Sequence, residues 1–412
     1  MEPLKLSVIN KAISGQMTGE DCLVKTISID SRTLLPGSLF IALKGKNFNG
    51  HDFVKVAEEN GAVAILAEEN VKANIPIIYV ENTENALGQL AAFVRQQFNA
   101  PILAITGTCG KTTTRAMLAS ILEQKNSVLY SQSSFNNAIG LPLTLLQQQK
   151  KHQFAVLEMG TNHFGELDYL TKIAKPDVAV VLNVGAGHLE GFGNIEGVSR
   201  AKGEIFSGLS QTGTAVINID DQFANYFRSL LQPKQKMVTF GLTDSADVWA
   251  SNIVVDVANK LSFDLHIEKK NIRVQLSTIG KHNVPNALAA ASMAHAVGID
   301  IEVIQKGLAE MQPVTKRMNL KKSKQGADII DDTYNAIPNA VHAALEVLAN
   351  MPGEKIFVFG GMGELGQHVE IEHRLVGEKA QALGINRLYA VGPFSHLTIN
   401  AFGSHGKLFS SK

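Results

Sequence analysis

Short, almost wholly apolar segments alternate with longer amphipathic ones through the middle of the chain. The apolar segments predict buried strands at residues 102–106, 154–158, 178–184 and 215–219. Strands without polar alternation are typical of a parallel sheet that helices cover on both faces, so we predict helices between them. Later segments lie close together and alternate in polarity, which predicts an antiparallel extension. These segments are residues 248–255, 261–267 and 272–276, followed by predicted helices at 284–297 and 301–311.

Both ends of the chain also alternate strand-like and helix-like segments. Near the N-terminus we predict strands at 38–43, 62–67 and 76–80, with helices at 52–60 and 84–98. Near the C-terminus we predict strands at 328–332, 355–359 and 387–391, helices at 339–350 and 374–383, and a frayed end at 404–412. Pro101 and Pro313 interrupt the pattern, because proline disfavours helical backbone in the residue before it. We therefore predict an α/β protein with domains at 1–98, 99–312 and 313–412.

Length and composition fit that organisation. At about 150 residues per domain, 412 residues correspond to roughly three domains. Hydrophobic residues make up 45% of the chain and charged residues 18%, which argues against disorder. Lys and Arg total 38, as do Asp and Glu. The zero net charge argues against a nucleic-acid partner or a membrane surface, although not against a local phosphate site.

Cysteine usage and hydropathy predict a cytoplasmic protein without membrane insertion. Cys22 and Cys109 are too few for a disulfide framework, and reduced thiols are typical of the cytosol. Residues 1–11 lack the apolar region of an export signal. No apolar stretch reaches the ~18 residues needed to span a bilayer.

The strongest chemical signal is the string T-G-T-C-G-K-T-T at residues 106–113, between a predicted strand and a helix predicted at 113–122. Its glycines let backbone N–H groups turn inward around phosphate oxygens, while Lys111 can neutralise phosphate charge and Thr112 can offer a hydroxyl to Mg²⁺. The usual phosphate loop has a glycine where this chain has Ile105, so the match is to a shorter G-x-x-G-K-T form. The predicted ATP-binding residues of the loop are Gly107, Thr108, Cys109, Gly110, Lys111, Thr112 and Thr113.

Two simpler interpretations concern this loop. It could be an ordinary tight turn, but a lysine at a helix N-terminus is unfavourable without an anion. Cys109 could be a reactive thiol whose pKa the helix N-terminus lowers, or a small spacer. We favour the phosphate loop, with Cys109 as a spacer.

Two polar residues follow other strands of the same predicted sheet. Glu158 ends the strand at 154–158, and His188 follows the strand at 178–184. Ligands of open α/β sheets bind beyond the carboxyl ends of the strands, so both side chains should meet the phosphate loop. A carboxylate and an imidazole there suit Mg²⁺ beside phosphates. Taken singly, Glu158 could be a surface charge and His188 a satisfied loop histidine, while Lys202 could contact phosphate or solvent.

With these residues in place, the chain resembles the Mur ligases, the ATP-dependent amide-forming enzymes of bacterial peptidoglycan precursor synthesis, over nearly its whole length. The strings H-L-E-G-F-G at 188–193, A-K-G-E-I-F at 201–206 and D-D-T-Y-N-A at 331–336 favour the branch that adds D-alanyl-D-alanine. The other strings are D-S-R at 30–32, L-P-G-S-L-F at 35–40, A-L-K-G at 42–45, G-H-D-F at 50–53, N-N-A-I-G-L-P at 136–142, E-M-G at 158–160, G-K-H-N at 280–283, N-A-L at 286–288, Arg317 and E-L-G at 364–366.

The resemblance implies a smaller α/β N-terminal domain, a central P-loop parallel-sheet ATPase domain and a Rossmann-like C-terminal domain. It implies that Thr112 and Glu158 hold one Mg²⁺, and that His188 and a CO₂-derived carbamate on Lys202 hold a second. Lys111, Lys202 and His188 would be the catalytic residues. Further ATP contacts would be Asn283, Asn286, Arg317, which would reach a phosphate, and Asp332, which would reach the ribose.

The resemblance also implies the substrates, UDP-N-acetylmuramoyl-tripeptide and D-alanyl-D-alanine. The residues implied for the UDP-substrate are Ser31, Arg32, Lys44, Asn47, His51, Asn136 and Asn137. A monomer is the default expectation, because the zero net charge gives no signal of an oligomer.

Two departures from the family leave alternatives open. Where relatives have Gly-Asp-Met, this chain has Gly360-Gly361-Met362, and the family continues past the position of Lys412 with a segment that completes the C-terminal domain. We therefore expect a shortened C-terminal domain, and a binding-only form that does not complete ligation is one alternative. A folate polyglutamate-type ligase shares the central architecture and is the other, although the D-S-R and A-L-K-G strings favour a UDP-sugar.

In the expected reaction, the terminal carboxylate of the tripeptide attacks the γ-phosphorus of ATP to form an acyl phosphate, and the amine of D-alanyl-D-alanine then displaces phosphate. Two anions must meet, so cations must lie between them. Loss of one such contact costs about 10²–10³ in rate.

We therefore expect Lys111→Ala to abolish ligation while the N-terminal domain stays folded. Product formation under saturating substrates, with circular dichroism as a check on folding, measures this effect. Ligation at the rate of the unmodified chain would refute the role of Lys111.

Overall fold

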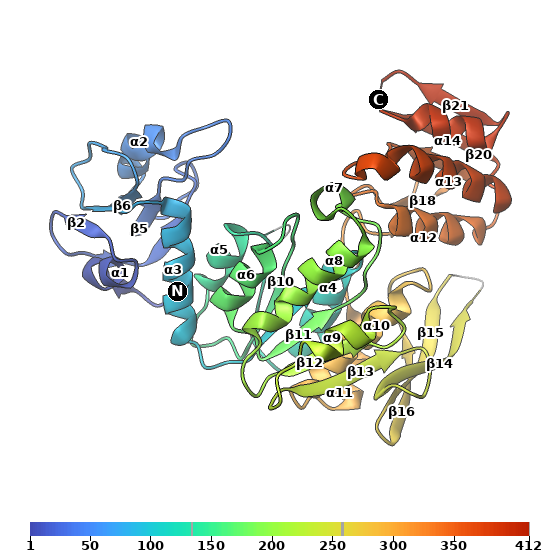
Figure 1. Cartoon of the computed structure of the whole chain (residues 1–412), viewed down its shortest axis with the longest axis horizontal. Helices are drawn as coiled ribbons and strands as arrows, with labels where there is room; N and C mark the ends of the chain where they lie inside the picture. Colours follow the sequence, from blue (N-terminus) through green and yellow to red (C-terminus); the bar gives the residue numbers. More distant parts are fainter. Residues whose placement is uncertain (133–134, 257–258, 412) are drawn as a thin grey trace.

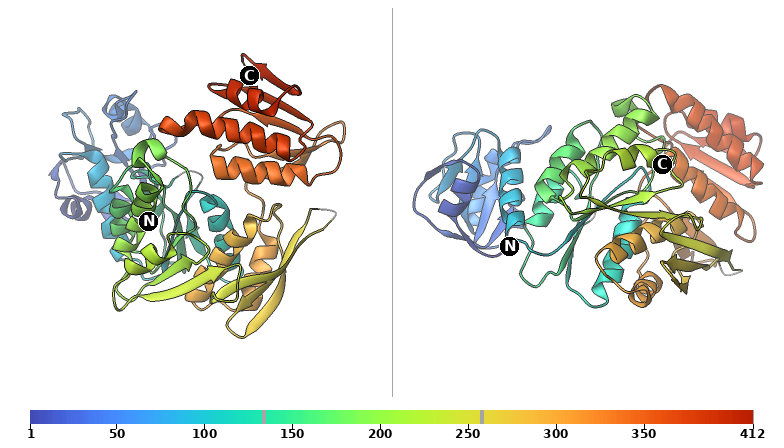
Figure 2. Two further views of the ribbon diagram at one scale, coloured as in Figure 1. Left: turned by 45° about the vertical axis from the view of Figure 1, so that its right-hand side comes forward. Right: turned by 60° about the horizontal axis from the view of Figure 1, so that its bottom comes forward.

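The computed structural model describes residues 1–412 except 133–134, 257–258 and 412. Three parts follow one another in sequence order, and the central part lies between the other two (Figures 1 and 2). The predicted α/β organisation with three domains is confirmed. In the described part of the chain, no helix combines the length and apolar character needed to cross a membrane.

The N-terminal part is built on a five-stranded sheet in the order β2-β7-β6-β5-β4. Strands β4 to β7 run parallel, and β2 pairs antiparallel with β7. Its strands are β1 (Leu4–Lys5), β2 (Gln16–Thr18), β3 (Leu23–Val24), β4 (Thr26–Ser28), β5 (Ser38–Ile41), β6 (Ala62–Ala67) and β7 (Ile77–Tyr79). Its helices are α1 (Leu6–Ala12), the 3-10 turn η1 (Gly50–Phe53), α2 (Val54–Glu59) and α3 (Thr83–Gln96).

The central part is a nine-stranded sheet in the order β16-β15-β14-β13-β12-β11-β8-β10-β9. The pairs from β9 to β14 are parallel, and β15 and β16 form the predicted antiparallel extension. Its strands are β8 (Ile102–Thr106), β9 (Val128–Tyr130), β10 (Phe154–Glu158), β11 (Val178–Val181), β12 (Thr214–Asn218), β13 (Lys236–Gly241), β14 (Val248–Val255), β15 (Leu261–Ile267) and β16 (Lys270–Gln275). Its helices are α4 (Lys111–Glu123), α5 (Gly140–Leu145), α6 (Glu166–Ala174), α7 (Leu189–Phe192), α8 (Ile195–Gly203), η2 (Glu204–Gly208), α9 (Ala224–Ser229), α10 (Asn283–Ala296) and α11 (Ile301–Glu310).

Alternate residues of the central strands enter two different cores, as period-two side chains in a doubly covered sheet must. Leu103 and Ile105 of β8 pack with α4, α10 and α11 on one face. Ile102 and Ala104 pack with α5, α6 and α8 on the other face, in a core that continues into α1 and α3 of the N-terminal part. The guanidinium of Arg95 strengthens this junction by donating hydrogen bonds to the carbonyls of Ala174 and Lys175. The two parts therefore share one apolar core.

The C-terminal part has a small core of its own. Its sheet has the parallel order β19-β20-β21, and β17 and β18 form a separate antiparallel pair. Its elements are β17 (Asn319–Lys322), β18 (Asp328–Asp331), α12 (Pro338–Ala349), β19 (Ile356–Phe359), η3 (Gly366–His368), α13 (Val369–Ala382), β20 (Arg387–Val391), α14 (Ser395–Phe402) and β21 (Gly406–Phe409).

Four expectations need correction here. The frayed end at 404–412 is wrong, because Gly406–Phe409 pairs in parallel with β20; Lys412 lies outside the described residues. The segment at 328–332 does not join the C-terminal sheet, since its partner is β17. Helix α13 begins at Val369 rather than at 374. Strand β11 ends at Val181, and residues 182–184 instead run towards the phosphate loop.

The packing of α11 on α4 gives a test of the central core. A Cβ at Gly307 would lie 2.3 Å from the Cα of Ile121, against backbone that cannot move aside. We expect Gly307→Ala to lower the free energy of unfolding by about 1–3 kcal/mol, the usual cost of overpacking. Urea denaturation measures the loss. Gly360→Ala is the control, because nothing lies within 4 Å of a Cβ there; equal midpoints for the two variants would contradict the packing argument.

Candidate nucleotide and metal site

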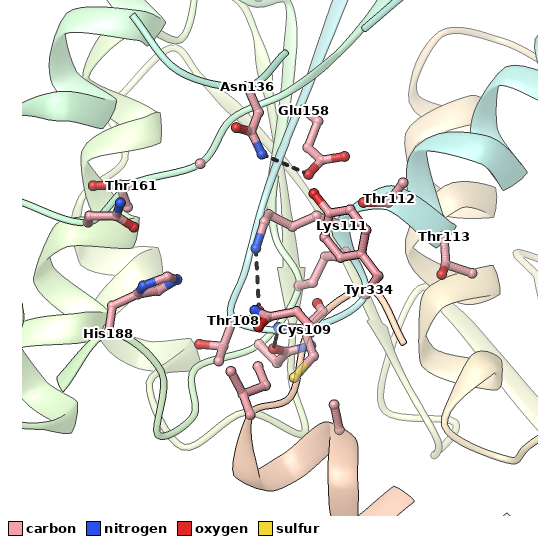
Figure 3. A pocket seen from close by; sticks show the side chains of 18 of the residues that line it. Thr108, Cys109, Lys111, Thr112, Thr113, Asn136, Glu158, Thr161, His188 and Tyr334 are labelled. Atoms are coloured by element: carbon pink, nitrogen blue, oxygen red, sulfur yellow. Dashed lines mark hydrogen bonds between the residues drawn. The ribbon is translucent and has the colours of Figure 1, made fainter. Parts of the chain in front are cut away.

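The predicted site lies at the carboxyl ends of β10, β8 and β11, which are neighbours in the sheet. A cavity of about 1240 Å³ opens there, and all three parts of the chain contribute to its lining. The central part supplies the phosphate loop, Glu158 and His188, while α3 supplies Glu84 and Asn85. Figure 3 shows that Lys111, Glu158 and His188 approach one cavity from different elements. The convergence expected from the strand ends is therefore present.

The phosphate loop joins β8 to α4, whose first residue is Lys111. Gly110 has a φ of +84°, and a Cβ there would lie 2.2 Å from Oδ1 of Asn286. Glycine is thus required by both backbone and space. The Nζ of Lys111 donates hydrogen bonds to the carbonyls of Gly107 at 2.8 Å and Thr108 at 3.3 Å. The lysine is thereby held across the mouth of the loop, where a phosphate would lie.

Asn183, just beyond β11, holds the loop to the neighbouring strand. Its Oδ1 accepts a hydrogen bond from the backbone N–H of Cys109 at 2.9 Å, and its Nδ2 donates to the carbonyl of Cys109 at 3.2 Å. Thr108 adds a hydrogen bond from the backbone N–H of Gly185 to its Oγ1 at 3.0 Å. Sequence reasoning missed Asn183 because the strand was predicted to run to 184; a polar residue near the end of an otherwise apolar segment was the available signal.

Poor solvation changes the pKa values of two loop residues. Burial lowers the pKa of Lys111, and the carboxylate of Glu158 opposes this shift. Burial raises the pKa of the Cys109 thiol. This effect is larger than the opposite effect of the nearby positive charges of Lys111 and Lys202, which lower the pKa. A raised pKa is the opposite of a reactive thiol and favours Cys109 as a spacer.

Glu158 is buried at the end of β10 and has one carboxylate oxygen engaged. Oε1 accepts a hydrogen bond from Nδ2 of Asn136 at 3.0 Å. Oε2 has no hydrogen bond from a described residue, although Nε of the buried Arg115 lies 3.6 Å away. A buried carboxylate oxygen without a hydrogen bond is suited to binding a cation. Arg115, which sequence reasoning missed, is held beside it by α4 and lies over the ring of Tyr130.

His188 and Lys202 follow β11 on the loop and helix predicted for them. His188 caps the start of α7 with a φ of +55°, and burial lowers the pKa of its imidazole, so the neutral form is favoured. Lys202 is buried on α8, and none of the described residues forms an ion pair with it. Burial, followed by the charge of Lys111, lowers the pKa of Lys202 well below its usual value. A neutral amine is the form favoured there.

The residues predicted from α10 and the C-terminal part also line the cavity: Asn283, Asn286, Arg317 and Asp332. The guanidinium of Arg317 lies 3.8 Å from the centroid of the Tyr334 ring, which holds it by a cation–π contact. Asp332 accepts a hydrogen bond from the backbone N–H of Met318 at 3.1 Å, and burial raises its pKa.

The residues predicted for the UDP-substrate fall into two groups. Asn136 and Asn137 line the cavity, but their side chains are engaged, with Glu158 and with the backbone N–H of Gly140. The other five do not line this cavity; they are Ser31, Arg32, Lys44, Asn47 and His51. They follow the carboxyl ends of β4 and β5 instead, at one edge of the N-terminal sheet.

Local contacts hold several of these N-terminal residues. Arg32 forms a 2.7 Å ion pair with Asp30, and Lys44 forms one of 2.7 Å with Glu69. His51 is buried, with Nδ1 at 2.7 Å from Asn49 and Nε2 accepting from the backbone N–H of Glu68 at 3.0 Å. Both ring nitrogens of His51 are therefore engaged: Nδ1 within its own loop, and Nε2 in linking the segment after β5 to the end of β6. Asn47 is exposed.

The donor set fits Mg²⁺ bound together with phosphates. Of the predicted cation and phosphate-loop residues, Gly107 and Lys202 alone do not line the cavity. The described residues contain no group of three or more His, Cys, Asp and Glu side chains that could hold an ion by themselves. Mg²⁺ usually takes one or two carboxylates, with substrate phosphates and waters completing its shell. Glu158, whose Oε2 has an ion pair with Arg115 but no hydrogen bond from a described residue, and Thr112 at the start of α4 provide such a partial site.

A phosphate loop at the carboxyl end of a central parallel strand, with a carboxylate and an imidazole after the two neighbouring strands, defines a P-loop nucleotide-binding protein. Three family models match the chain: Mur ligase family, catalytic domain, at 23–95; Mur ligase middle domain at 105–294; and Mur ligase, glutamate ligase domain, at 316–408. The chain belongs to the Mur ligase family, whose members are ATP-dependent ligases.

Relatives and solved structures agree with these matches. The UDP-N-acetylmuramoyl-tripeptide–D-alanyl-D-alanine ligase of Escherichia coli K12 is 39% identical over 412 residues, which cover 100% of this chain and 91% of that protein. MurF from Acinetobacter baumannii is 36% identical with a TM-score of 0.94, covering 99% of this chain and 90% of that one. MurF ligase from Thermotoga maritima in complex with ADP is 31% identical with a TM-score of 0.82, covering 93% and 88%.

A folylpolyglutamate synthase from Mycobacterium tuberculosis is similar in fold alone. It is 14% identical with a TM-score of 0.64, covering 80% of this chain and 85% of that one.

The two hydrogen bonds between Asn183 and the backbone of Cys109 give a test of the site. We expect Asn183→Ala to weaken ADP binding about tenfold or more, because loss of a partner for buried polar groups costs about 1–3 kcal/mol. Titration calorimetry with ADP measures it. Asn126→Ala, just beyond the far end of α4, is the control, since its amide donates a hydrogen bond to the carbonyl of Leu122 at that helix end. If Asn183→Ala bound ADP as tightly as the control variant does, the phosphate loop would not depend on the hydrogen bonds of Asn183.

Proposed function

We propose that this chain joins D-alanyl-D-alanine to the terminal carboxylate of UDP-N-acetylmuramoyl-tripeptide, using ATP and Mg²⁺ and passing through an acyl phosphate. The product is the pentapeptide precursor of peptidoglycan. One observation carries the proposal: a single cavity joins the phosphate loop and Glu158 to residues of the N-terminal and C-terminal parts. Such a cavity lets a carboxylate from one side reach a triphosphate held from the other.

The residues of this chain act mainly by placing charge. Lys111 exchanges its contacts with the carbonyls of Gly107 and Thr108 for phosphate oxygens. Arg317, oriented by Tyr334, contacts a phosphate, and Asp332 accepts a hydrogen bond from the ribose. Asn283 and Asn286, at the start of α10, contact the nucleotide. Transfer is fast when positive charge is already in place as negative charge develops, because no group must reorganise.

Two cation sites complete this arrangement. Thr112 and Glu158 would hold the first Mg²⁺, and His188 with modified Lys202 would hold the second. The bound ions supply positive charge between the carboxylate and the γ-phosphate. Asn136 supports the first site by fixing Oε1 of Glu158, which leaves Oε2 for the cation.

Lys202 carries a carbamate formed when its neutral amine adds to CO₂ and releases a proton. The burial of Lys202, its lack of an ion-pair partner among described residues and the nearby charge of Lys111 all favour the neutral amine. The carbamate would replace this neutral amine with an anion that can bind Mg²⁺. It also gives the buried side chain a charge opposite to that of Lys111.

The remaining site residues are assigned to the UDP-substrate. The UDP end is bound beside the carboxyl ends of strands of the N-terminal sheet, where the site is formed by Ser31, Arg32, Lys44, Asn47 and His51. The rest of the substrate is faced by Asn136 and Asn137.

Domain boundaries lie near 99 and 313, the second beside Arg317. The chain acts as a monomer in the bacterial cytoplasm. Neither alternative is favoured, since a relative 39% identical over the whole of this chain is a D-alanyl-D-alanine-adding ligase and the folate enzyme shares the fold alone.

Phosphate release is the experiment that tests the function. The purified chain should release phosphate from ATP only when UDP-N-acetylmuramoyl-tripeptide and D-alanyl-D-alanine are both present, and a pentapeptide product should appear by mass spectrometry. Equal release with a folate and glutamate, or release that ignores the dipeptide, would contradict the proposal.

The modification of Lys202 is tested separately. Intact mass measured under CO₂ should rise by one carbamate, and Lys202→Ala should lose ligation, with partial recovery in added acetate or formate, which can replace the carbamate oxygens. Lys172→Ala is the control, because that lysine is exposed and pairs with Asp168 at the surface. Full ligation by Lys202→Ala without added carboxylate would contradict the role.

A further inference from the structure

His188 is contacted from a different domain by Glu364. Nδ1 of the imidazole lies 2.5 Å from Oε2 of Glu364, whose side chain is 60% exposed while that of His188 is 25% exposed. The backbone adds to the junction, because the N–H of Glu190 donates to the carbonyl of Glu364 at 3.4 Å. Glu364 lies on the loop between β19 and η3, so this contact joins the C-terminal part to the loop that bears a proposed cation ligand.

The loop that carries Glu364 is fixed within the C-terminal part. The fully buried His373 of α13 directs Nδ1 at the carbonyl of Val369, 2.7 Å away, so Nδ1 donates and Nε2 accepts from the backbone N–H of Met362 at 3.1 Å. Leu365 anchors the other side of Glu364 in the C-terminal core. The position of the Glu364 carboxylate therefore follows that of the C-terminal domain as a whole.

A histidine that binds a metal through one nitrogen usually directs the other at a carboxylate or carbonyl, which fixes the ring and its tautomer. Glu364 is placed for that relation to His188: its Oε2 lies beside Nδ1, although the two are not aligned as a hydrogen bond in this structure, and Nε2 is left for an ion. Figure 3 shows the ring of His188 extending towards the phosphate loop. Among the described residues, no second acidic side chain comes within ion-pair distance of His188.

We propose that Glu364 is a positioning residue that orients His188 across the domain interface and makes cation binding at His188 depend on the placement of the C-terminal domain. The inference rests on the proposed function, because it concerns the second cation of that reaction. The linkage runs both ways: a cation at His188 stabilises the placement that brings Glu364 to it.

Mn²⁺ in place of Mg²⁺, added with ADP, tests the inference without turnover. Electron paramagnetic resonance measures how many ions bind and how tightly, and pulsed measurements detect the nitrogen of a bound imidazole. We expect Glu364→Gln to weaken the nitrogen-coupled site about 10–100-fold, the usual effect of removing such a carboxylate. Glu364→Asp should recover part of the loss, because a carboxylate remains.

Glu370→Gln is the matched control, since it removes the same charge from an exposed position nearby that has no ion pair with a described residue. Hydrogen exchange adds a second readout: ADP with Mn²⁺ should slow exchange at residues 188–192 and 362–366 in the unmodified chain and in Glu370→Gln, but not in Glu364→Gln.

Two results would overturn the inference alone. Glu364→Gln could bind Mn²⁺ as Glu370→Gln does, or bind it more tightly, which would mean that Glu364 competes with the cation for His188. In either case the unmodified chain would still release phosphate in response to both substrates. If the unmodified chain neither bound Mn²⁺ with ADP nor released phosphate, the proposed function itself would fail, and the inference with it.

Discussion

Positive charge must lie between a carboxylate and a triphosphate before either can approach the other, and the architecture of this protein follows from that requirement. A parallel sheet brings the carboxyl ends of several strands to one edge, so residues distant in sequence can surround one small volume. Lys111, Glu158 and His188 come together in this way. The same crowding is costly without ligands: Lys111 contributes to lowering the pKa of Lys202, and both are poorly solvated. The site is thus prepared for anions and cations to arrive together.

The domains are joined in two different ways. The N-terminal part shares an apolar core with the central sheet, and Arg95 holds the junction by hydrogen bonds to backbone carbonyls. The C-terminal part has its own core and reaches the site through polar side chains such as Arg317, Asp332 and Glu364. Interfaces of this kind permit relative motion, whereas a continuous core resists it. Closure of the C-terminal domain on the nucleotide is the motion this arrangement allows.

Sequence alone predicted much of the central domain because its strands are short, apolar and buried on both faces. It failed where pairing rather than hydrophobicity defines a strand. Strand β21 has exposed Lys407, Leu408 and Phe409 and is recognisable only by its pairing with β20. Strand β9 is just three residues long, and no strand was predicted there. Propensity cannot separate such segments from loops or ends.

The residues of the site likewise fall into those that the sequence could predict and those that it could not. Residues next to strand ends or in the phosphate loop could be predicted, since one strand–loop–helix unit places them. Arg115 and Glu364 could not, because their partners are reached only through the packing of α4 on β10 or of one domain on another. Asn136, expected to contact the UDP-substrate, lines the cavity, and its amide supports Glu158. Such supporting roles depend on distances that no local pattern contains.

A crystal structure with a non-hydrolysable ATP analogue and Mn²⁺ tests the central claim most directly, because anomalous scattering locates the ions. We predict one ion between a phosphate, Thr112 and Glu158, and a second beside His188 and Lys202. Ions bound elsewhere, or Thr112, Glu158 and His188 turned away from the phosphates, would contradict it.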